Sequence, residues 1–342
     1  MPKPNILLIY TGGTIGMVKN FETGALKVFN FKKLLQNIPE LKQLDCDIQT
    51  VSFESPIDSS NMDPSKWVMI ANLVKDNYNS YDGFVILHGS DTMSYSASAL
   101  SFMLENLNKP VVFTGSQLPI GDLRTDAKEN LITAIQVASL HHDGQPIIRE
   151  VCLYFEYKLY RGNRTTKISA EHFNAFTSPN YPALAESGVH LKVNKEYLNH
   201  ANDGKQLSVG LEFEDNVAIV KMFPGLNVKV MQAIVNIPNL KGIVLETYGA
   251  GNAPSEDWFI GILQRAIESG LHVVNVTQCS GGRVNMGHYE TSTLLKEIGV
   301  ISGADITTEA AITKMMYLLG RHPEHAKFKD LFETSLRGEL SE

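Results

Sequence analysis

Short apolar runs alternate with amphipathic segments along most of this chain, and this alternation restricts the fold more than any other feature. An apolar run without alternating polar residues predicts a strand buried on both faces, as in a parallel sheet with helices on both sides. The strands predicted in the first half are Asn5–Tyr10, Ile48–Phe53, Gly83–His88, Val111–Thr114 and Val151–Phe155. Strands that alternate with helices indicate a doubly wound α/β domain.

The segments between these strands have helical spacing. Leu100, Met103, Leu104 and Leu107 occur at positions i, i+3, i+4 and i+7, which places them on one helix face. The segment 125–140 shows the same spacing. We therefore expect a helix in each of these two segments.

The composition of the sequence changes at residues 196–214, which are polar and rich in turn formers. This stretch predicts a linker with a possible hairpin. Further strands are predicted after it at Val217–Phe223, Gly242–Thr247 and Leu271–Val276. We expect two α/β domains: a larger N-terminal one over 1–195 with a mainly parallel, doubly wound sheet, and a smaller parallel one over 215–342.

The bulk composition favours a soluble protein with a small-molecule site. The 342 residues carry a net charge of −7 and no long basic block, which argues against a nucleic-acid partner. No apolar run approaches the ~20 residues of a membrane helix, and the N-terminus lacks the features of a signal peptide. Cys46, Cys152 and Cys279 form no CxxC pair, which predicts reduced thiols and a cytoplasmic location.

Glycine lies beside hydroxyl residues at the ends of three predicted strands, in 11–16, 89–92 and 114–117. Sites in open parallel sheets form at the carboxyl ends of strands. The first turn reads G-G-x-x-G, which is neither the dinucleotide fingerprint nor a P-loop. Thr14 follows its glycine pair and can present a hydroxyl; a tight turn with Thr14 as a cap is the alternative.

The other polar strand ends also allow two interpretations. Ser90 and Asp91 place a hydroxyl beside a carboxylate, or they cap a helix that starts near Ser94. His88 is interpreted as a structural residue. The turn at 56–62 follows another strand and is a candidate for hydrogen bonds to a carboxylate.

The segment 159–169 contains Arg161, Arg164 and Lys167. Such a run usually forms a solvated charged face. A lysine that enters a polar pocket could instead act as a base, because desolvation favours its neutral form. His141 and His142 are adjacent and would point apart on a helix, so no metal ligand set is predicted. No motif indicates a cofactor.

The motifs TGGTIG, HGSDTM, TGSQLP and YRGNRTTK occur in this order, and with YGAGNAP and VTQCSGGRVNMGHY they make the chain resemble the bacterial L-asparaginases. The resemblance is closest to the cytoplasmic type I enzymes and covers essentially the whole chain. It implies two α/β domains, a homodimer or homotetramer, and hydrolysis of L-asparagine to L-aspartate and ammonia without a cofactor or metal.

The resemblance also assigns roles to individual residues. Thr14 would be the nucleophile that forms a β-aspartyl enzyme. Ser90, Lys167 and Asp91 would form a triad-like set in which Lys167 acts on the Ser90 hydroxyl. The substrate-binding residues implied by the resemblance are Asp58, Ser59, Ser60, Ser90 and Asp91, with Asp91 on the substrate ammonium and Ser59 on its α-carboxylate.

This chain departs from the pattern of the family in three places. Ser90 stands where relatives have threonine, which keeps the hydroxyl and predicts retained activity. Ala25 occupies the expected place of a loop tyrosine, for which Tyr317 at a subunit interface is a hypothetical substitute. Glu246 stands where a regulatory site has arginine; its charge would repel a ligand carboxylate, so we expect little or no allosteric activation.

Three alternatives to an asparaginase stay open. A transfer-RNA-dependent amidotransferase subunit would carry an extra N-terminal domain, for which a first strand at Asn5 is expected to leave no room. A sensor that only binds asparagine would not need both Thr14 and Lys167. A preference for glutamine would depend on one methylene, which a pocket discriminates by only ~1–3 kcal/mol.

Overall fold

The computed structural model describes residues 3–19, 26–28, 38–200, 204–287 and 290–341. The chain divides into two compact units, Met1–Leu211 and Glu212–Glu342, each with its own main sheet. The division lies inside the segment 196–214. Part of that segment, β16 (Ser208–Val209), pairs with β6 (Leu104–Glu105) of the first unit rather than forming a hairpin of its own.

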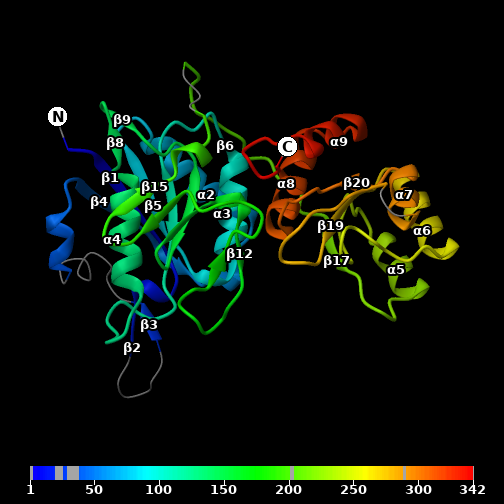
Figure 1. Cartoon of the computed structure of the whole chain (residues 1–342), viewed down its shortest axis with the longest axis horizontal. Coiled ribbons are helices and arrows are strands. Elements are labelled where there is room, and N and C mark those ends of the chain that lie inside the picture. Colours follow the sequence, from blue (N-terminus) through cyan, green and yellow to red (C-terminus); the bar gives the residue numbers. More distant parts are fainter. Residues whose placement is uncertain (1–2, 20–25, 29–37, 201–203, 288–289, 342) are drawn as a thin grey trace. The chain divides into compact units, whose positions relative to one another are not determined.

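The main sheet of the first unit has the strand order β15-β14-β11-β10-β7-β5-β1-β4 among the described residues (Figure 1). Its strands are β1 (Asn5–Gly12), β4 (Asp47–Ile57), β5 (Gly83–Leu87), β7 (Val111–Thr114), β10 (Val151–Phe155), β11 (Lys158–Arg161), β14 (Ala185–Ser187) and β15 (Leu191–Val193). The five strands from β4 to β10 in this order are parallel. The last three pair antiparallel, and their short polar runs were not among the predicted strands. The prediction of a mainly parallel sheet is confirmed.

The order of the parallel strands locates the place where a ligand can bind. In chain order they are arranged 2-1-3-4-5, so the sequence of strands reverses between β1 and β5. At such a reversal the loops after the two strands turn to opposite faces of the sheet and leave a crevice at their carboxyl ends. The loops after β1 and β5 contain Thr14 and Ser90.

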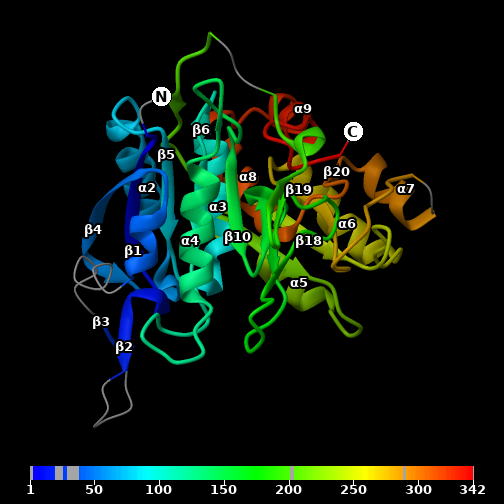
Figure 2. The same cartoon turned by 60° about the vertical axis from the view of Figure 1, so that its left-hand side comes forward.

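Helices cover both faces of this sheet, with α4 (Ala127–Ala138) on one side and α2 (Pro64–Asn77) and α3 (Met93–Met103) on the other (Figures 1 and 2). Leu131 and Ile135 of α4 belong to the same buried cluster as Ile6 and Val85. On the other side, the Trp67 indole N–H donates to Ser96 Oγ over 2.9 Å and links α2 to α3. Both expected helices are present, but α3 ends at Met103, so Leu104 and Leu107 of its apolar pattern lie beyond it.

The chain forms a short hairpin after α4. His141 and His142 lie in a two-residue strand, β8, that pairs with β9 (Gln145–Pro146), so the expectation that they would point apart on a helix does not apply. Asp143 and Gly144 connect β8 to β9 and have φ angles of 51° and 75°. An Asp-Gly pair with positive φ forms a tight hairpin turn.

The smaller elements of the first unit lie in the loops. They are the antiparallel pair β2 (Met17–Lys19) and β3 (Leu26–Val28), the antiparallel pair β12 (Thr166–Lys167) and β13 (Phe176–Thr177), and short 3₁₀ turns. Within the described residues of the whole chain, no helix has both the length and the apolar character needed to cross a membrane.

The second unit is a smaller parallel sheet, as predicted. Its strands run in chain order: β17 (Val217–Lys221), β18 (Gly242–Thr247), β19 (His272–Thr277) and β20 (Ile301–Ser302). Its helices are α5 (Val228–Val235), α6 (Asp257–Glu268), α7 (Glu290–Glu297), α8 (Thr308–Arg321) and α9 (His325–Glu333). Because the order of these four strands never reverses, this sheet has no switch point of the kind found between β1 and β5.

Helices pack on both faces of the second sheet as well. Met231 of α5 and Phe259 of α6 share a buried cluster with Ile243 and Val273. On the other face α8 lies so close that a Cβ on Gly242 would be 2.4 Å from Met315 Sδ. Figure 1 shows α5, α6 and α7 on one side of these strands and α8 on the other.

A buried histidine makes the second unit sensitive to acid. The His272 ring lies against His325 and Phe328, with centroids 4.8 and 4.3 Å away. Burial lowers the pKa of His272 to about 4, and the neighbouring His325 adds to this effect. An unfolded histidine takes up a proton near pH 6.5. Between these pH values the unfolded chain binds the proton and the folded unit does not, so stability is lost as pH falls.

We therefore expect the urea midpoint of the second unit to fall between pH 6.5 and 4, and to fall less steeply in His272→Phe. The chain has 2 tryptophans, Trp67 in the first unit and Trp258 in the second. In a Trp67→Phe background, the fluorescence of Trp258 therefore reports on the unfolding of the second unit alone. Equal slopes with and without His272 would contradict the assignment.

Candidate active site

The ends of β1 and β5 touch through glycine. Gly13 has a φ of 85°, and a Cβ on it would lie 2.6 Å from the Cα of Gly89. A Cβ on Gly89 would in turn lie 2.4 Å from Ser59 Oγ. Only glycine allows backbones to approach this closely with a positive φ. Each glycine immediately precedes a predicted site residue, Thr14 and Ser90 respectively.

Ser90, Asp91 and Lys167 come together although they are far apart in sequence. Lys167 Nζ donates to Ser90 Oγ over 2.8 Å and to Asp91 Oδ1 over 2.7 Å. The Lys167 side chain is 17% exposed and that of Asp91 67%. Neither Ser90 nor Asp91 caps a helix, since the caps of 3₁₀ turn 90–92 and of α3 have no side-chain hydrogen bond. The capping interpretation is therefore wrong.

Lys167 follows two buried arginines in the chain. It lies in β12, which pairs with β13 beyond the turn at 162–164. Arg161 and Arg164 are 4% and 1% exposed, and both guanidinium groups lie over the Tyr181 ring, 4.3 and 5.1 Å from its centroid. Arg161 also pairs with Glu150 at 2.6 Å. The interpretation of this run as a solvated face is wrong for both arginines.

Residues 58–60 form a turn after β4 that faces the same strand ends. Asp58 caps it, because its Oδ1 accepts a hydrogen bond from the Ser60 N–H at 3.0 Å. Ser59 is buried, and its carbonyl accepts from the Thr92 hydroxyl at 2.7 Å. Asp58 and Ser60 are exposed. The turn thus lies beside the Gly89–Ser90 backbone, and within the described residues no hydrogen bond or ion pair joins it to Lys167.

Thr11 and His88 have structural contacts. The Thr11 hydroxyl is 1% exposed and donates to the Leu87 carbonyl at 2.9 Å, which ties β1 to β5. His88 Nδ1 lies 2.7 Å from the Gly89 carbonyl oxygen, and Nε2 lies 2.9 Å from Ser96 Oγ. Burial lowers the pKa of His88 to about 4, so the ring is neutral at pH 7. Because a carbonyl only accepts, Nδ1 carries the hydrogen.

Gln117 is a site residue that the sequence analysis left without a role. Its Oε1 accepts a hydrogen bond from the Ser90 hydroxyl, with 3.2 Å between the two oxygen atoms. The turn TGSQLP was recognised as one of the polar strand ends, but nothing in the sequence indicates which of its side chains points at Ser90. That direction depends on the loop at 168–175, which is distant in sequence.

The described residues offer no metal site and no reactive buried thiol. No group of three or more His, Cys, Asp and Glu side chains in the described part of the chain is arranged to hold a metal ion. Burial raises the pKa of the Cys46 and Cys152 thiols, which disfavours the nucleophilic thiolate. The hydroxyls at the strand ends are therefore the better candidate nucleophiles.

The structure bears in different ways on Ala25, Tyr317 and Glu246, the residues discussed above for the departures from the family pattern. Ala25 lies outside the described residues. Tyr317 is 5% exposed and packs on Phe213 at 6.0 Å inside its own unit, and its role at a subunit interface stays a hypothesis. Glu246 Oε1 accepts from the Thr308 hydroxyl at 2.6 Å, and Oε2 lies 3.9 Å from Lys221 Nζ.

Comparison with known proteins tests the resemblance. Residues 5–199 match the family described as "Asparaginase, N-terminal", and residues 216–332 match the "Glutaminase/Asparaginase C-terminal domain". The chain is 44% identical to L-asparaginase 1 of Escherichia coli (strain K12) over 344 residues, which cover 100% of this chain and 99% of that protein.

Solved structures show the same likeness. The crystal structure of L-asparaginase I from Vibrio cholerae is 40% identical with a TM-score of 0.90, and the match covers 99% of this chain and 100% of that one. The thermostable L-asparaginase from Thermococcus kodakarensis is 33% identical with a TM-score of 0.89, covering 99% of each chain. The resemblance is confirmed, and the chain belongs to the L-asparaginase family of enzymes.

Proposed function

We propose that this protein hydrolyses L-asparagine to L-aspartate and ammonia, with Thr14 as the nucleophile. The observation that carries the proposal is the contact of Lys167 Nζ with both Ser90 Oγ and Asp91 Oδ1, beside the strand end that bears Thr14. Membership of the L-asparaginase family supports the choice of substrate. A protein that only binds asparagine has no need of a lysine poised on a serine hydroxyl.

In the first step, Thr14 Oγ1 forms a bond to the carbon of the substrate side-chain amide. The hydroxyl proton ends on the amide nitrogen, the C–N bond breaks, and ammonia leaves. The product is a β-aspartyl ester of Thr14. Backbone N–H groups of the glycine turns are suitable donors for the oxyanion of the tetrahedral intermediate, and losing one such donor typically costs ~10²–10³ in turnover.

In the second step, water attacks the ester carbon. The bond between that carbon and Thr14 Oγ1 breaks, one water proton returns to the threonine, and L-aspartate leaves. A threonine hydroxyl is a weak nucleophile at neutral pH and needs a positioned base. Lys167 acts on Ser90 to move these protons, and Asp91 holds the lysine in position.

The substrate's charged ends are bound by the acidic and hydroxyl residues of the turns. Asp91 contacts Lys167 through Oδ1. Its Oδ2 accepts no hydrogen bond from the described residues, so Oδ2 is available to the substrate ammonium. Ser59 and nearby backbone N–H groups bind the α-carboxylate, with Asp58 and Ser60 shaping the turn. No cofactor is needed for these steps.

Ammonia release from L-asparagine and L-glutamine over a concentration series tests the proposal. We expect one ammonia for each aspartate formed. Absence of ammonia with either substrate would favour an asparagine sensor, and release only in the presence of a transfer-RNA-dependent partner would favour an amidotransferase subunit. The same series measures the preference between asparagine and glutamine.

The shape of the rate curve tests the expectation for Glu246. Its carboxylate is engaged by Thr308 and lies near Lys221, and it would still repel a ligand carboxylate. We expect a hyperbolic curve against L-asparagine, and a clearly sigmoidal one would contradict this. A homodimer or homotetramer in the cytoplasm stays a prediction from the family resemblance.

The contact between the strand ends predicts a severe effect for Gly13→Ala. The new Cβ would lie 2.6 Å from backbone atoms of Gly89, and alanine disfavours a φ of 85°. Because a 1 Å displacement in an active site can cost ~10²-fold in rate, we expect at least about a tenfold loss of ammonia release.

Gly144→Ala is the matched control, because Gly144 has a φ of 75° and nothing within 4 Å of its Cβ position. It carries the backbone strain of about 1–3 kcal/mol without the collision. Equal activities of the two variants would show that the strand ends need not touch.

A further inference from the structure

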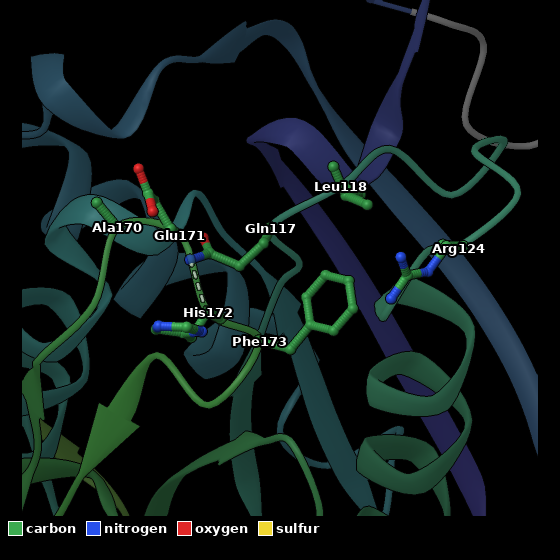
Figure 3. Close-up of a pocket in the computed structure, with 7 residues that line it drawn as sticks. All are labelled: Gln117, Leu118, Arg124, Ala170, Glu171, His172 and Phe173. Atoms are coloured by element: carbon green, nitrogen blue, oxygen red, sulfur yellow. Dashed lines mark hydrogen bonds between the residues drawn. The ribbon is translucent and has the colours of Figure 1, made fainter.

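The Gln117 side chain lies between Ser90 and the loop that follows Lys167. Its amide lines a pocket of about 460 Å³ together with Arg124, His172 and Phe173. Figure 3 shows the Gln117 side chain directed toward His172, with the hydrogen bond between them. Gln117 Nε2 lies 3.1 Å from the His172 carbonyl oxygen and 3.5 Å from that of Ser169.

The backbone of Gln117 is fixed independently of its side chain. The carboxylate of Asp126, which is 6% exposed, accepts hydrogen bonds from the N–H of Gln117 at 2.9 Å and of Leu118 at 3.1 Å. Asn130, one turn later in α4, donates to the Gly115 carbonyl at 3.0 Å. The turn is thus anchored to α4, and this fixes the position of the backbone from which the Gln117 side chain extends.

The partners of the amide determine its orientation. Both carbonyl oxygens accept hydrogen bonds and cannot donate, so the amide nitrogen faces them. The amide oxygen then faces Ser90, and an oxygen without hydrogen requires the serine to be the donor. The ammonium of Lys167 can only donate, so Ser90 Oγ accepts from it. Together these contacts form a directed chain from Lys167 to Ser90, from Ser90 to Gln117, and from Gln117 to His172.

We propose that Gln117 is a positioning residue that fixes the direction of the Ser90 hydroxyl. The inference rests on the proposed function and extends it. Gln117 holds the hydroxyl hydrogen away from Lys167 in the resting site and leaves Oγ free to accept from the lysine. Once the Lys167 ammonium has lost a proton to solvent, its neutral amine can accept the serine proton during turnover, and the hydroxyl then turns from Gln117 to the lysine. Gln117 therefore acts on turnover through Ser90, without touching the substrate.

The variant Gln117→Glu tests this direction. A protonated glutamic acid has one acceptor and one donor oxygen, so it reproduces the pattern of the amide. An ionised one only accepts, and it faces the carbonyl oxygens of His172 and Ser169 with no hydrogen to offer. An ordinary glutamate ionises near pH 4.3, so the donor is lost as pH rises. We expect kcat relative to the parent to fall by about tenfold or more between pH 4 and 8, with KM within about twofold.

Two further variants make the experiment decisive. Gln136→Glu introduces the same change on the exposed face of α4 and is expected to give a flat ratio to the parent at every pH. Gln117→Met keeps the length without either hydrogen bond, and we expect a low kcat that does not recover in acid. Circular dichroism spectra like that of the parent show that the variants are folded.

A flat kcat ratio for Gln117→Glu, or parental kcat in Gln117→Met, would overturn the role of Gln117. Both results would leave the proposed function intact as long as the parent protein releases ammonia. If the parent protein releases no ammonia, the proposed function fails, and no kcat ratio can then be measured for the variants.

Discussion

Thr14→Ala is expected to lower ammonia release from L-asparagine by at least about 10³-fold, the order of loss seen when a covalent nucleophile is removed. Without the hydroxyl no β-aspartyl ester forms, and water must attack the amide directly. The substrate-binding groups are unchanged, so calorimetry should still detect asparagine binding. Thr14→Ser restores a hydroxyl and should recover part of the activity.

Thr11→Ser is the matched control for Thr14. Thr11 lies three residues earlier in the same strand end, and its hydroxyl donates to the Leu87 carbonyl at 2.9 Å. Serine can keep that hydrogen bond, so we expect activity close to that of the parent. Substantial turnover by Thr14→Ala would assign the nucleophile to another hydroxyl, with Ser90 as the first to test.

Glu339→Gln is expected to destabilise the second unit by about 3–5 kcal/mol, because it leaves a buried charge without its partner. Lys314 and Glu339 are both 0% exposed and lie 2.5 Å apart. The other donors of Lys314 go to the carbonyl oxygens of Phe332 and Thr334, each at 2.7 Å. Glu339 also accepts from the N–H of Leu336 and of Arg337, so its contacts tie the chain end to α8.

The double variant Lys314→Met/Glu339→Gln separates the charge from the packing. Removing both charges eliminates the unpaired ion, so we expect the double variant to be more stable than Glu339→Gln alone. Urea unfolding followed by Trp258 fluorescence in the Trp67→Phe background measures these two variants and the single variant Lys314→Met. If the two single losses simply add in the double variant, the pair is not coupled and the explanation is wrong.

Much of the fold follows from patterns that are local in the chain. Val111–Thr114, Val151–Phe155 and Gly242–Thr247 have the predicted bounds as strands, because continuous apolar runs must be buried on both faces. The errors occurred where a partner strand decided the outcome. The helix predicted through Leu107 ends at Met103, where Leu104 enters β6 and pairs with Val209, and β11 pairs with β10 despite its charged residues.

The candidate site shows the same division. Glycine and hydroxyl residues at strand ends identified Thr14, Ser90 and Asp91 as candidates, since parallel strands bring their carboxyl ends together. The same reasoning could not distinguish a solvated lysine from a poised one at Lys167. The contacts of Lys167 Nζ with Ser90 Oγ and Asp91 Oδ1 decide this point.

By itself, the sequence determined the α/β class, the family and the strand ends where chemistry is possible, because each depends on residue types at fixed local spacing. Only the tertiary structure decided which side chains meet there. The 2.8 Å contact of Lys167 with Ser90 joins residues 77 positions apart, and that of Ser90 with Gln117 joins residues 27 apart. The physical reason is that a hydrogen bond depends on the distance and direction of two groups in space, and those are set by the strand order and the packing of the loops.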